Sequence, residues 1–519
     1  MLFDRAIVQQ RPRWQRSLLG WLVCLTTLSV GGWLALRPGA AQALVSPPPL
    51  SWATAGRPRP GLFPPRFTFA PYLQDVTESG IVIMWATDVS TTGVVRVFDA
   101  LPPAGRSGGE GEQPAVDPGF EPEQQPLAVF ISPPGTHHRI RLTGLRPGTR
   151  YRYVVAARRP GDSAAMESAM PLVDFATASA RGPFNFLVYG DNRDRDADHA
   201  SVIQAMLSES PDFVLQTGDM VSRASDEGQW RRYFSTAWPL LRSAPLYPVL
   251  GNHELRFEPD AGHFHRLFSL PLAAQKRRPV YYSFRYNNSL FLAIDGNSPY
   301  DQDQAAWIEK TLRTHQGNSE IRHTFVFVHQ PPFAVGAYCG SERLARRVVP
   351  ILQRYGVRAV FAGHEHAYQH LERAGVRYFI SGGGGAPLYT RSQACNFEDD
   401  QALRLFRAEH HYLKVQVDGD AAVLMAINRQ GELMERVSLS EPVREIPIPL
   451  PPVDEERAWP PRPHEAPLLA LSTTSPPSTA SVRNSASSSG TGPLLILWLS
   501  SIAILAGLLM LTRDLRRRR

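Results

Sequence analysis

Acidic, amide and imidazole side chains follow five apolar, strand-like runs of this 519-residue chain. In chain order these ends read Gly190-Asp191, Gly218-Asp219, Gly251-Asn252-His253-Glu254, Val328-His329 and Gly363-His364-Glu365-His366. Ligands of α/β sheets bind beyond the carboxyl ends of strands, so we expect these side chains in one crevice. Oxygen and nitrogen donors without a thiolate suit Mn, Fe or Zn. A carboxylate that bridges two such ions can hold them roughly 3.5–4 Å apart, the arrangement for in-line displacement at phosphorus.

Each of these strand ends is a weak signal when it is taken alone. A Gly-Asp pair is usually a turn, and a His after an apolar strand more often packs or lies at the surface. His364 and His366 stand two residues apart and would face the same side of a strand. Five such ends in order are hard to obtain by chance, and together they predict a metal site.

The elements that must position these residues lie between residues 183 and 440, where strand-like and helix-like segments alternate. This alternation predicts an α/β domain. Strands are expected at 184–191, 212–219, 246–254, 324–332, 357–366 and 376–385, a hairpin at 280–295, helices at 199–207, 230–241, 302–315 and 342–355, and a β-meander at 411–439.

Residues 67–178 have a different pattern, with short alternating strands separated by turn residues. This pattern is typical of an all-β, fibronectin- or Ig-like sandwich. The stretch 145–153 looks like the turn into a strand of a fibronectin-type sandwich, where a Tyr packs over the corner. Residues 101–126 are rich in Gly, Pro and Glu, which predicts a disordered insertion.

Both ends of the chain carry apolar runs beside basic residues. Residues 1–43 predict a signal peptide, with an uncleaved anchor as the alternative, and residues 493–512 predict a transmembrane helix before a basic cytoplasmic tail at 513–519. A Pro-rich linker at 44–66 and a disordered Pro/Ser/Thr-rich stalk at 441–492 are expected next to them. We therefore expect an exported bacterial protein, anchored at the extracytoplasmic face by one C-terminal helix. Much of the net charge of +7 lies at the two ends, so it does not indicate nucleic-acid binding.

The chain has three Cys residues, of which Cys24 lies in the expected signal peptide. Cys339 and Cys395 remain in the exported part, where disulfides persist. We expect these two residues to form a disulfide, with two unpaired thiols as the alternative.

The ordered set GD, GD, GNHE, VHQPP and GHEHAY resembles the calcineurin-like metallophosphoesterases. The stretches PYLQDVTESGIVIMW (71–85) and GHEHAYQ (363–369) are similar to bacterial relatives of purple acid phosphatases that have an N-terminal fibronectin-type domain. The resemblance covers residues 67–440 and implies two mixed sheets flanked by helices.

The resemblance also implies a centre of two metal ions, Fe, Mn or Zn. Asp219 would bridge the ions, Asp191 and His366 would bind the first, and Asn252, His329 and His364 would bind the second. His253 would contact the substrate phosphate and serve as general acid to the leaving group, with Glu254 orienting it. A hydroxide activated by the ions would attack phosphorus.

Two positions depart from the family pattern. Ser222 stands where purple acid phosphatases have the Tyr that binds Fe(III), which predicts that no purple Fe(III)–Tyr site forms. Arg193 stands where other members have a His ligand, and a guanidinium cannot bind a cation. We expect Arg193 to grip the substrate phosphate, the alternative being a salt bridge to Asp194 or Asp226. His199 is the candidate replacement ligand, the alternative being that it only begins a helix.

The remaining candidates are side chains near the rim of the expected crevice. Tyr338 and Tyr368 are expected to wall the substrate pocket, with packing as the alternative for each. Glu365 is expected to support the neighbouring ligands. The pairs His137–His138 and His410–His411 are expected at the surface.

These observations predict a metal-dependent phosphomonoesterase of the acid phosphatase type, acting on a phosphorylated small molecule outside the cytoplasm. A phosphodiesterase or nucleotidase with the same metals is the second reading. A surface-anchored adhesion or scaffold protein with a decayed hydrolase fold is the third. The intact set of expected ligands argues against the third reading.

Overall fold

The computed structural model describes residues 63–100, 125–163, 166–271, 280–298, 302–395 and 397–443. The expected signal peptide, transmembrane helix and basic tail lie outside these residues, as do nearly all of the linker and stalk and most of the insertion at 101–126. Within the described part of the chain, no helix is long and apolar enough to cross a membrane.

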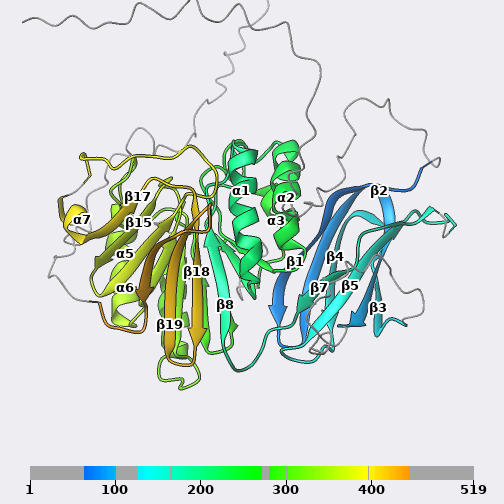
Figure 1. Ribbon diagram of the computed structural model, residues 1–519, viewed down its shortest axis with the longest axis horizontal. Coiled ribbons are helices and arrows are strands. Elements are labelled where there is room, and N and C mark those ends of the chain that lie inside the picture. Colours follow the sequence, from blue (N-terminus) through cyan, green and yellow to red (C-terminus); the bar gives the residue numbers. More distant parts are fainter. Residues whose placement is uncertain are drawn as a thin grey trace, which may run out of the picture. The chain divides into compact units, whose positions relative to one another are not determined.

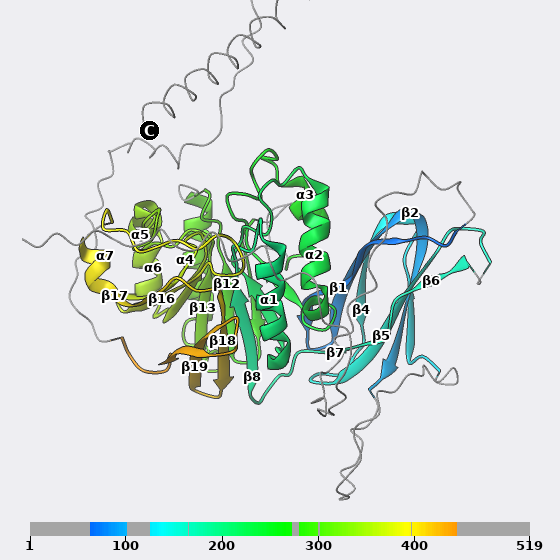
Figure 2. The ribbon, with the colours of Figure 1, turned by 45° about the horizontal axis from the view of Figure 1, so that its top comes forward.

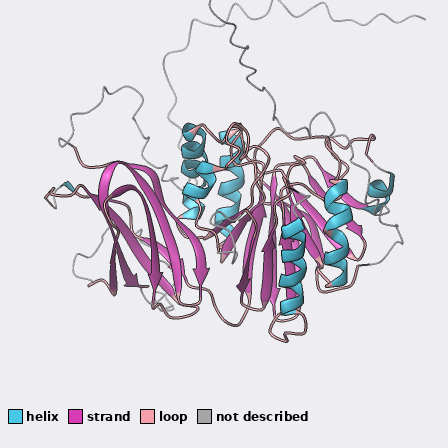
Figure 3. Cartoon of the chain, turned by 180° about the vertical axis from the view of Figure 1, so that it is seen from behind, coloured by secondary structure: helices cyan, strands magenta, loops and turns pink. Residues whose placement is uncertain are grey.

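The first described region is built of strands, as the sequence predicts (Figure 3). Its strands are β1 (Phe67–Thr77), β2 (Gly80–Asp99), β3 (Ala128–Ile131), β4 (Gly135–Thr143), β5 (Arg150–Arg158), β6 (Ser168–Ala169) and β7 (Val173–Ala176). The long strand β2 pairs with β1 and β4 through its first half and with β3 and β5 through its second half. The Tyr151 hydroxyl accepts a hydrogen bond from the Arg146 backbone N–H at 2.9 Å, at the corner where a packed Tyr was expected.

The second region, from β8 onward, is an α/β domain with two mixed sheets (Figure 1). The first sheet has the order β10-β9-β8-β18-β19-β20, and the second has the order β11-β12-β13-β14-β16-β15-β17. The first contains β8 (Phe184–Tyr189), β9 (Phe213–Gln216), β10 (Leu246–Pro248), β18 (His411–Asp418), β19 (Ala421–Asn428) and β20 (Leu433–Ser438). The second contains β11 (Tyr282–Tyr286), β12 (Ser289–Ala293), β13 (His323–Phe327), β14 (Ala359–Ala362), β15 (Tyr368–Arg373), β16 (Val376–Ser381) and β17 (Leu403–Arg407).

The two sheets face each other across an aromatic core. Phe186 of β8 stacks on Phe213 at 5.2 Å and meets Phe325 and Phe361 of the other sheet edge to face. The outer faces are also apolar, because helices cover them, and this explains why the central strands read as continuous apolar runs.

Helices cover the outer face of each sheet. The helices α1 (Asp196–Met206), α2 (Glu227–Leu241) and α3 (Gly262–Leu267) pack on the first sheet, and α4 (Gln302–His315), α5 (Glu342–Arg347) and α6 (Val349–Arg354) pack on the second. Helices α1 and α2 lie side by side (Figure 2). A short turn η2 (Leu207–Glu209) follows α1, and α7 (Phe397–Ala402) precedes β17.

Several details of the α/β domain differ from the sequence-based expectation. The helix expected at 342–355 divides at Val348, because Pro350 has no N–H and fits only the first turn of a helix. The short helices α3 and α7 and the strand β17 were not expected, and neither was the strand β15. Its Arg373 is buried and is paired with Asp399 at 2.5 Å.

The first half of β2 is buried on both faces, because the outer face of its sheet packs against α2 and α3. Phe69 meets Phe234 of α2 edge to face at 5.5 Å. The Tyr72 hydroxyl donates to the Leu267 carbonyl at 2.7 Å, and the Trp238 indole N–H donates to the Pro71 carbonyl at 3.0 Å. The two regions therefore share an apolar interface with hydrogen bonds across it.

Candidate functional site

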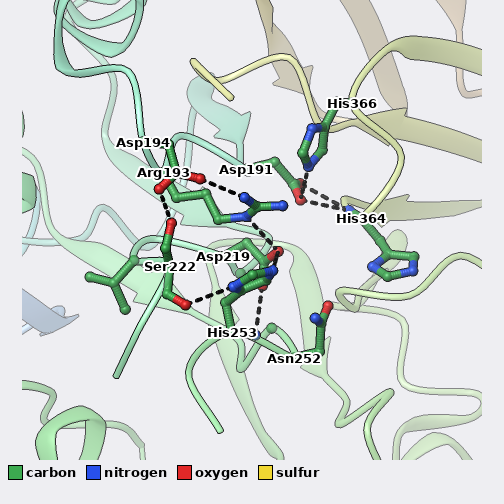
Figure 4. Close-up of polar contacts among 12 residues, drawn as sticks. Asp191, Arg193, Asp194, Asp219, Ser222, Asn252, His253, His364 and His366 are labelled. Atoms are coloured by element: carbon green, nitrogen blue, oxygen red, sulfur yellow. Dashed lines mark hydrogen bonds and ion pairs between the residues drawn. The ribbon is translucent and has the colours of Figure 1, made fainter. Parts of the chain in front are cut away.

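The five strand ends that carry the candidate residues meet at one place in the α/β domain (Figure 4). Three of them follow β8, β9 and β10 of the first sheet, and two follow β13 and β14 of the second. Within each sheet these strands run parallel to one another, so their carboxyl ends lie on the same edge. The crevice is thus built by both sheets, with ligands from each.

The first donor group consists of Asp191, Asp219 and His366, all of which are buried. Their candidate ligand atoms lie within 4.8 Å of one another, and His366 Nε2 is 3.5 Å from Asp191 Oδ1. The other ring nitrogen of His366, Nδ1, is 2.7 Å from the Pro387 carbonyl. A carbonyl only accepts hydrogen bonds, so Nδ1 carries the proton and the Nε2 lone pair faces the carboxylates.

The second donor group adjoins the first and is centred on His329. The Nε2 atom of His329 lies 3.0 Å from Asn252 Oδ1, 3.2 Å from His364 Nδ1 and 3.4 Å from Asp219 Oδ1. Its Nδ1 is held by the Thr217 carbonyl at 2.8 Å, so Nε2 again faces the site. Burial lowers the pKa of His329, but the Asp219 and Asp191 carboxylates outweigh this and raise it. Both groups contain Asp219, as expected of a bridging ligand.

The backbone at this site adopts conformations that most residues avoid. Asp191, Asp219 and His364 have φ values of 56°, 57° and 70°, in the left-handed region where residues with a Cβ are uncommon. A Cβ added to Gly251 would lie 2.2 Å from Asp219 Oδ1, and one added to Gly363 would lie 2.4 Å from Asp191 Oδ2. The glycines beside the ligands are therefore required for close approach of the loops.

Glu254 holds two of the ligand loops together. Its carboxylate accepts the backbone N–H groups of Asp219 at 2.8 Å and Gly251 at 2.7 Å. Burial, together with the charge of Asp219, raises the pKa of Glu254 to about 7. We expected Glu254 to orient the His253 ring, but His253 Nδ1 is instead bonded to the Ser222 carbonyl at 2.8 Å. Glu254 does not orient the ring, because both of its oxygens accept backbone N–H groups of the loops.

Glu365 has a similar role between His364 and His366. It accepts the backbone N–H groups of Ala337 and Tyr338, each at 2.6 Å. Burial raises the pKa of Glu365 to about 7. Its contacts are those of a residue that supports the neighbouring loop.

Arg193 lies inside the site, between Asp194 and Asp219 (Figure 4). Its Nη1 is 2.6 Å from Asp194 Oδ2, and its Nε is 3.4 Å from Asp219 Oδ2. The Ser222 hydroxyl donates to the other Asp194 oxygen. Burial opposes the charge, but the Asp219 and Asp194 carboxylates raise the pKa of Arg193. Asp226, the other expected partner, instead caps α2 by accepting the Gly228 N–H at 2.9 Å.

The structure places His199 away from both donor groups, which corrects the expectation that it replaces a ligand. Its ring lies between Tyr189 and Tyr233, with ring centroids 5.8 and 5.6 Å away. The first turn of α1 directs it into the packing between α1, α2 and the sheet, where it lines a small pocket with Arg193 and Asp194. Burial lowers the pKa of His199 to about 3.

The two tyrosines that were expected to wall the pocket lie in different places. The Tyr338 ring is 4.8 Å from the His364 ring. Tyr368 is fully buried at the start of β15, where its hydroxyl donates to Glu435 at 2.6 Å, so it does not wall the site. Tyr389, which was not predicted, stacks on His366 with ring centroids 4.0 Å apart. No motif marks Tyr389; the only signal is its place shortly after a Gly-rich turn.

Three of the four histidines that were expected at the surface are buried. His138 faces inward, bonded to Thr91 and Ser132, and His410 and His411 are also buried. Only His137 is exposed. The expected disulfide between Cys339 and Cys395 is present, which confirms that prediction.

Residues 184–368 match the calcineurin-like phosphoesterase family, and this span contains every residue of both donor groups. The chain is 24% identical over 281 residues to purple acid phosphatase 21 of Arabidopsis thaliana, covering 51% of this chain and 61% of that protein. It is 30% identical over 228 residues to Fe(3+)-Zn(2+) purple acid phosphatase 12 of the same plant, covering 40% of this chain and 48% of that protein. The chain therefore spans about half to three-fifths of the length of these relatives.

Among solved structures, the chain is similar to purple acid phosphatase PPD1 from yellow lupin seeds. The TM-score is 0.57 at 16% sequence identity, and the alignment covers 71% of this chain and 73% of that one. At this identity the likeness shows the fold alone. The α/β domain thus has the metallophosphoesterase fold, as the sequence predicts.

Proposed function

We propose that this chain is a metal-dependent phosphoric ester hydrolase that cleaves phosphomonoesters at a centre of two metal ions. The observation that carries the proposal is the meeting of two donor groups at Asp219, with Arg193 and His253 beside them. The family match over the same residues supports this reaction class. The named relatives are phosphatases, and one carries Fe(3+) and Zn(2+) in its name, which supports a centre that contains Fe or Zn.

The donor set fits such ions. Asp191, Asp219 and His366 would hold one ion, and Asp219 with Asn252, His329 and His364 would hold the other. Carboxylate, amide and imidazole donors are those that Mn, Fe and Zn prefer. The ions would neutralise charge on the phosphoryl oxygens and lower the pKa of an attacking water.

Arg193 and His253 would act on the substrate itself. Asp194 holds the guanidinium beside Asp219, where its remaining N–H groups can donate to phosphate oxygens. The Ser222 carbonyl holds His253 Nδ1, which leaves Nε2 facing the site, 3.9 Å from Asp219 Oδ2. When the ring is doubly protonated, the proton on Nε2 can pass to the leaving oxygen. The positive charge of Arg193, in addition to the metal ions, favours a doubly charged phosphomonoester over a singly charged diester.

The test uses the purified chain, stripped with a chelator and reloaded with Mn, Zn or Fe. We expect metal-dependent hydrolysis of p-nitrophenyl phosphate and about two ions per chain by elemental analysis. Faster hydrolysis of bis(p-nitrophenyl) phosphate would favour the phosphodiesterase reading. If neither ester is hydrolysed with any metal, the scaffold reading is left. Asn252→Ala should lower activity and metal content together.

We also propose that the protein is exported and held at the extracytoplasmic face by its C-terminal apolar run. The basis is the pattern of apolar and basic residues at both ends, which lies outside the described residues. The Cys339–Cys395 disulfide supports an oxidising compartment. Digestion of intact cells with an added protease should remove the folded part, and full protection would contradict this location.

A further inference from the structure

We propose that Tyr338, Tyr389 and the Cys339–Cys395 disulfide form a positioning device for the histidines of the metal centre. We call these four residues the stapled wall. The inference rests on the proposed metal centre, because the wall contacts His364 and His366, one from each donor group. The wall residues would not bind the ions; they would hold the imidazoles that do.

The segment 387–389 makes three contacts with His366. The Pro387 carbonyl accepts from Nδ1 at 2.7 Å, and the Tyr389 backbone N–H donates to the His366 carbonyl at 2.9 Å. The Tyr389 ring stacks on the imidazole at 4.0 Å with an interplanar angle of 13°. Both the tautomer and the plane of the His366 ring are therefore set by this one segment.

The segment 337–338 contacts Glu365 and His364, on the other side of the donor groups. Its two N–H groups are bonded to Glu365, which lies between His364 and His366 in the chain. The Tyr338 ring is 4.8 Å from the His364 ring and meets Tyr389 edge to face at 5.7 Å. The two tyrosines thus form a continuous aromatic face against the two imidazoles.

These two segments are loops, and the disulfide joins them. Cys339 directly follows Tyr338, and Cys395 lies six residues after Tyr389, so the two cysteines are 56 positions apart in the chain. The Ser392 backbone N–H also donates to the Val335 carbonyl at 2.9 Å, which links the same two loops. A covalent link restricts the relative motion of loops that have little regular structure. We infer that the bridge preorganises the His366 ring for ion binding.

The test is calorimetric titration of the metal-free protein with Zn²⁺, which does not depend on activity. We expect Tyr389→Ala to weaken the binding of one ion by about 10-fold or more, the range found when residues behind metal ligands are changed. Tyr389→Phe keeps the stacked ring and should bind as the wild type does. The double variant Cys339→Ala/Cys395→Ala should resemble Tyr389→Ala.

Tyr355→Ala is the matched control, because Tyr355 is also half-buried but precedes β14, at the end opposite His364. It should leave both Zn²⁺ affinities unchanged. Wild-type affinities in Tyr389→Ala would overturn the inference, whereas a wild-type protein that binds no ion would overturn the proposed function instead. Circular dichroism of the metal-free variants checks folding. If the cysteine variant does not fold, the comparison of Tyr389→Ala with Tyr389→Phe decides.

Discussion

Arg193 places a permanent positive charge in a site whose other candidate residues are mainly carboxylates and imidazoles. Its side chain is only 15% exposed, and the guanidinium lies against Asp219, which both donor groups share. A cation in that position reduces the repulsion between the carboxylates of the site. The same position allows the guanidinium to reach a phosphate held by the ions. Kinetic measurements can therefore separate a role in substrate binding from a role in balancing the carboxylates.

We predict that Arg193→Ala raises the KM for p-nitrophenyl phosphate by about 10- to 100-fold, because a charge-assisted hydrogen bond contributes about 1.5–3 kcal/mol. Metal content should stay unchanged. Arg232→Ala is the control, since Arg232 is 56% exposed and only loosely paired with Asp196. An unchanged KM together with lost metal would show that Arg193 serves only to balance the carboxylates.

His199 makes the stability of the fold sensitive to acid. Its pKa is lowered by burial to about 3, well below the value of about 6.5 in an unfolded chain. The unfolded chain therefore binds a proton that the folded chain excludes, and stability is lost as the pH falls below about 6.5. Between pH 7 and pH 5 this group should reduce the free energy of unfolding by about 2 kcal/mol.

His199→Phe should remove that part of the pH dependence, because Phe fits between Tyr189 and Tyr233 and does not titrate. Urea unfolding of the metal-free chain at pH 7 and pH 5 measures the change in the free energy of unfolding between the two pH values. An equal loss of stability in variant and wild type would show that His199 is not the cause.

At the scale of elements, the site depends on loops whose backbone is held by buried carboxylates. Glu254 joins the loops after β9 and β10, and Glu365 joins the end of β14 to the loop before α5. These loops carry residues with left-handed backbone, which isolated loops would not keep. The carboxylates therefore maintain the conformation that the ligands require.

We predict that Glu254→Gln lowers the free energy of unfolding by about 3 kcal/mol, because the amide NH₂ faces backbone N–H groups that then lack an acceptor. Urea unfolding of the metal-free chain provides the measurement. Glu320→Gln is the control, since Glu320 is 67% exposed in its pair with Arg285 and should change stability by less than about 1 kcal/mol. Similar effects in both variants would contradict the role assigned to Glu254.

At the scale of the whole described molecule, the all-β region of β1–β7 and the α/β domain share a buried interface. Phe69 is 2% exposed and packs on Phe234 of α2. Separation of the regions would expose the outer face of the sheet that contains β1, so we expect them to unfold together.

Phe69→Ala should lower the midpoint of a single urea transition by an amount equivalent to about 3 kcal/mol, from loss of packing and a cavity. Fluorescence and circular dichroism should give coincident curves, since Trp85 lies in β2 of the all-β region and Trp230 in α2. Phe257→Ala, at a side chain that is 56% exposed, is the control. Two separate transitions would show that the regions unfold independently.

Much of the α/β domain was predictable because its central strands are buried on both faces and therefore appear in the sequence as short, continuous apolar runs. The helix expected at 302–315 agrees with α4 from end to end. Strand β15 was missed because its charged residues are neutralised by partners distant in the chain, such as Asp399. The division of the helix at Val348 comes from Pro350. The apolar residues keep helical spacing across the division, so their pattern predicts one continuous helix.

By itself, the sequence determined which strand ends carry donors, because each donor directly follows the run that positions it. That local relation placed Asp191, Asp219 and His366 correctly at the carboxyl ends of strands. The tertiary structure alone decided what His199 and Tyr389 contact. Their surroundings come from elements far away in the chain, and no spacing in the sequence encodes the packing between those elements.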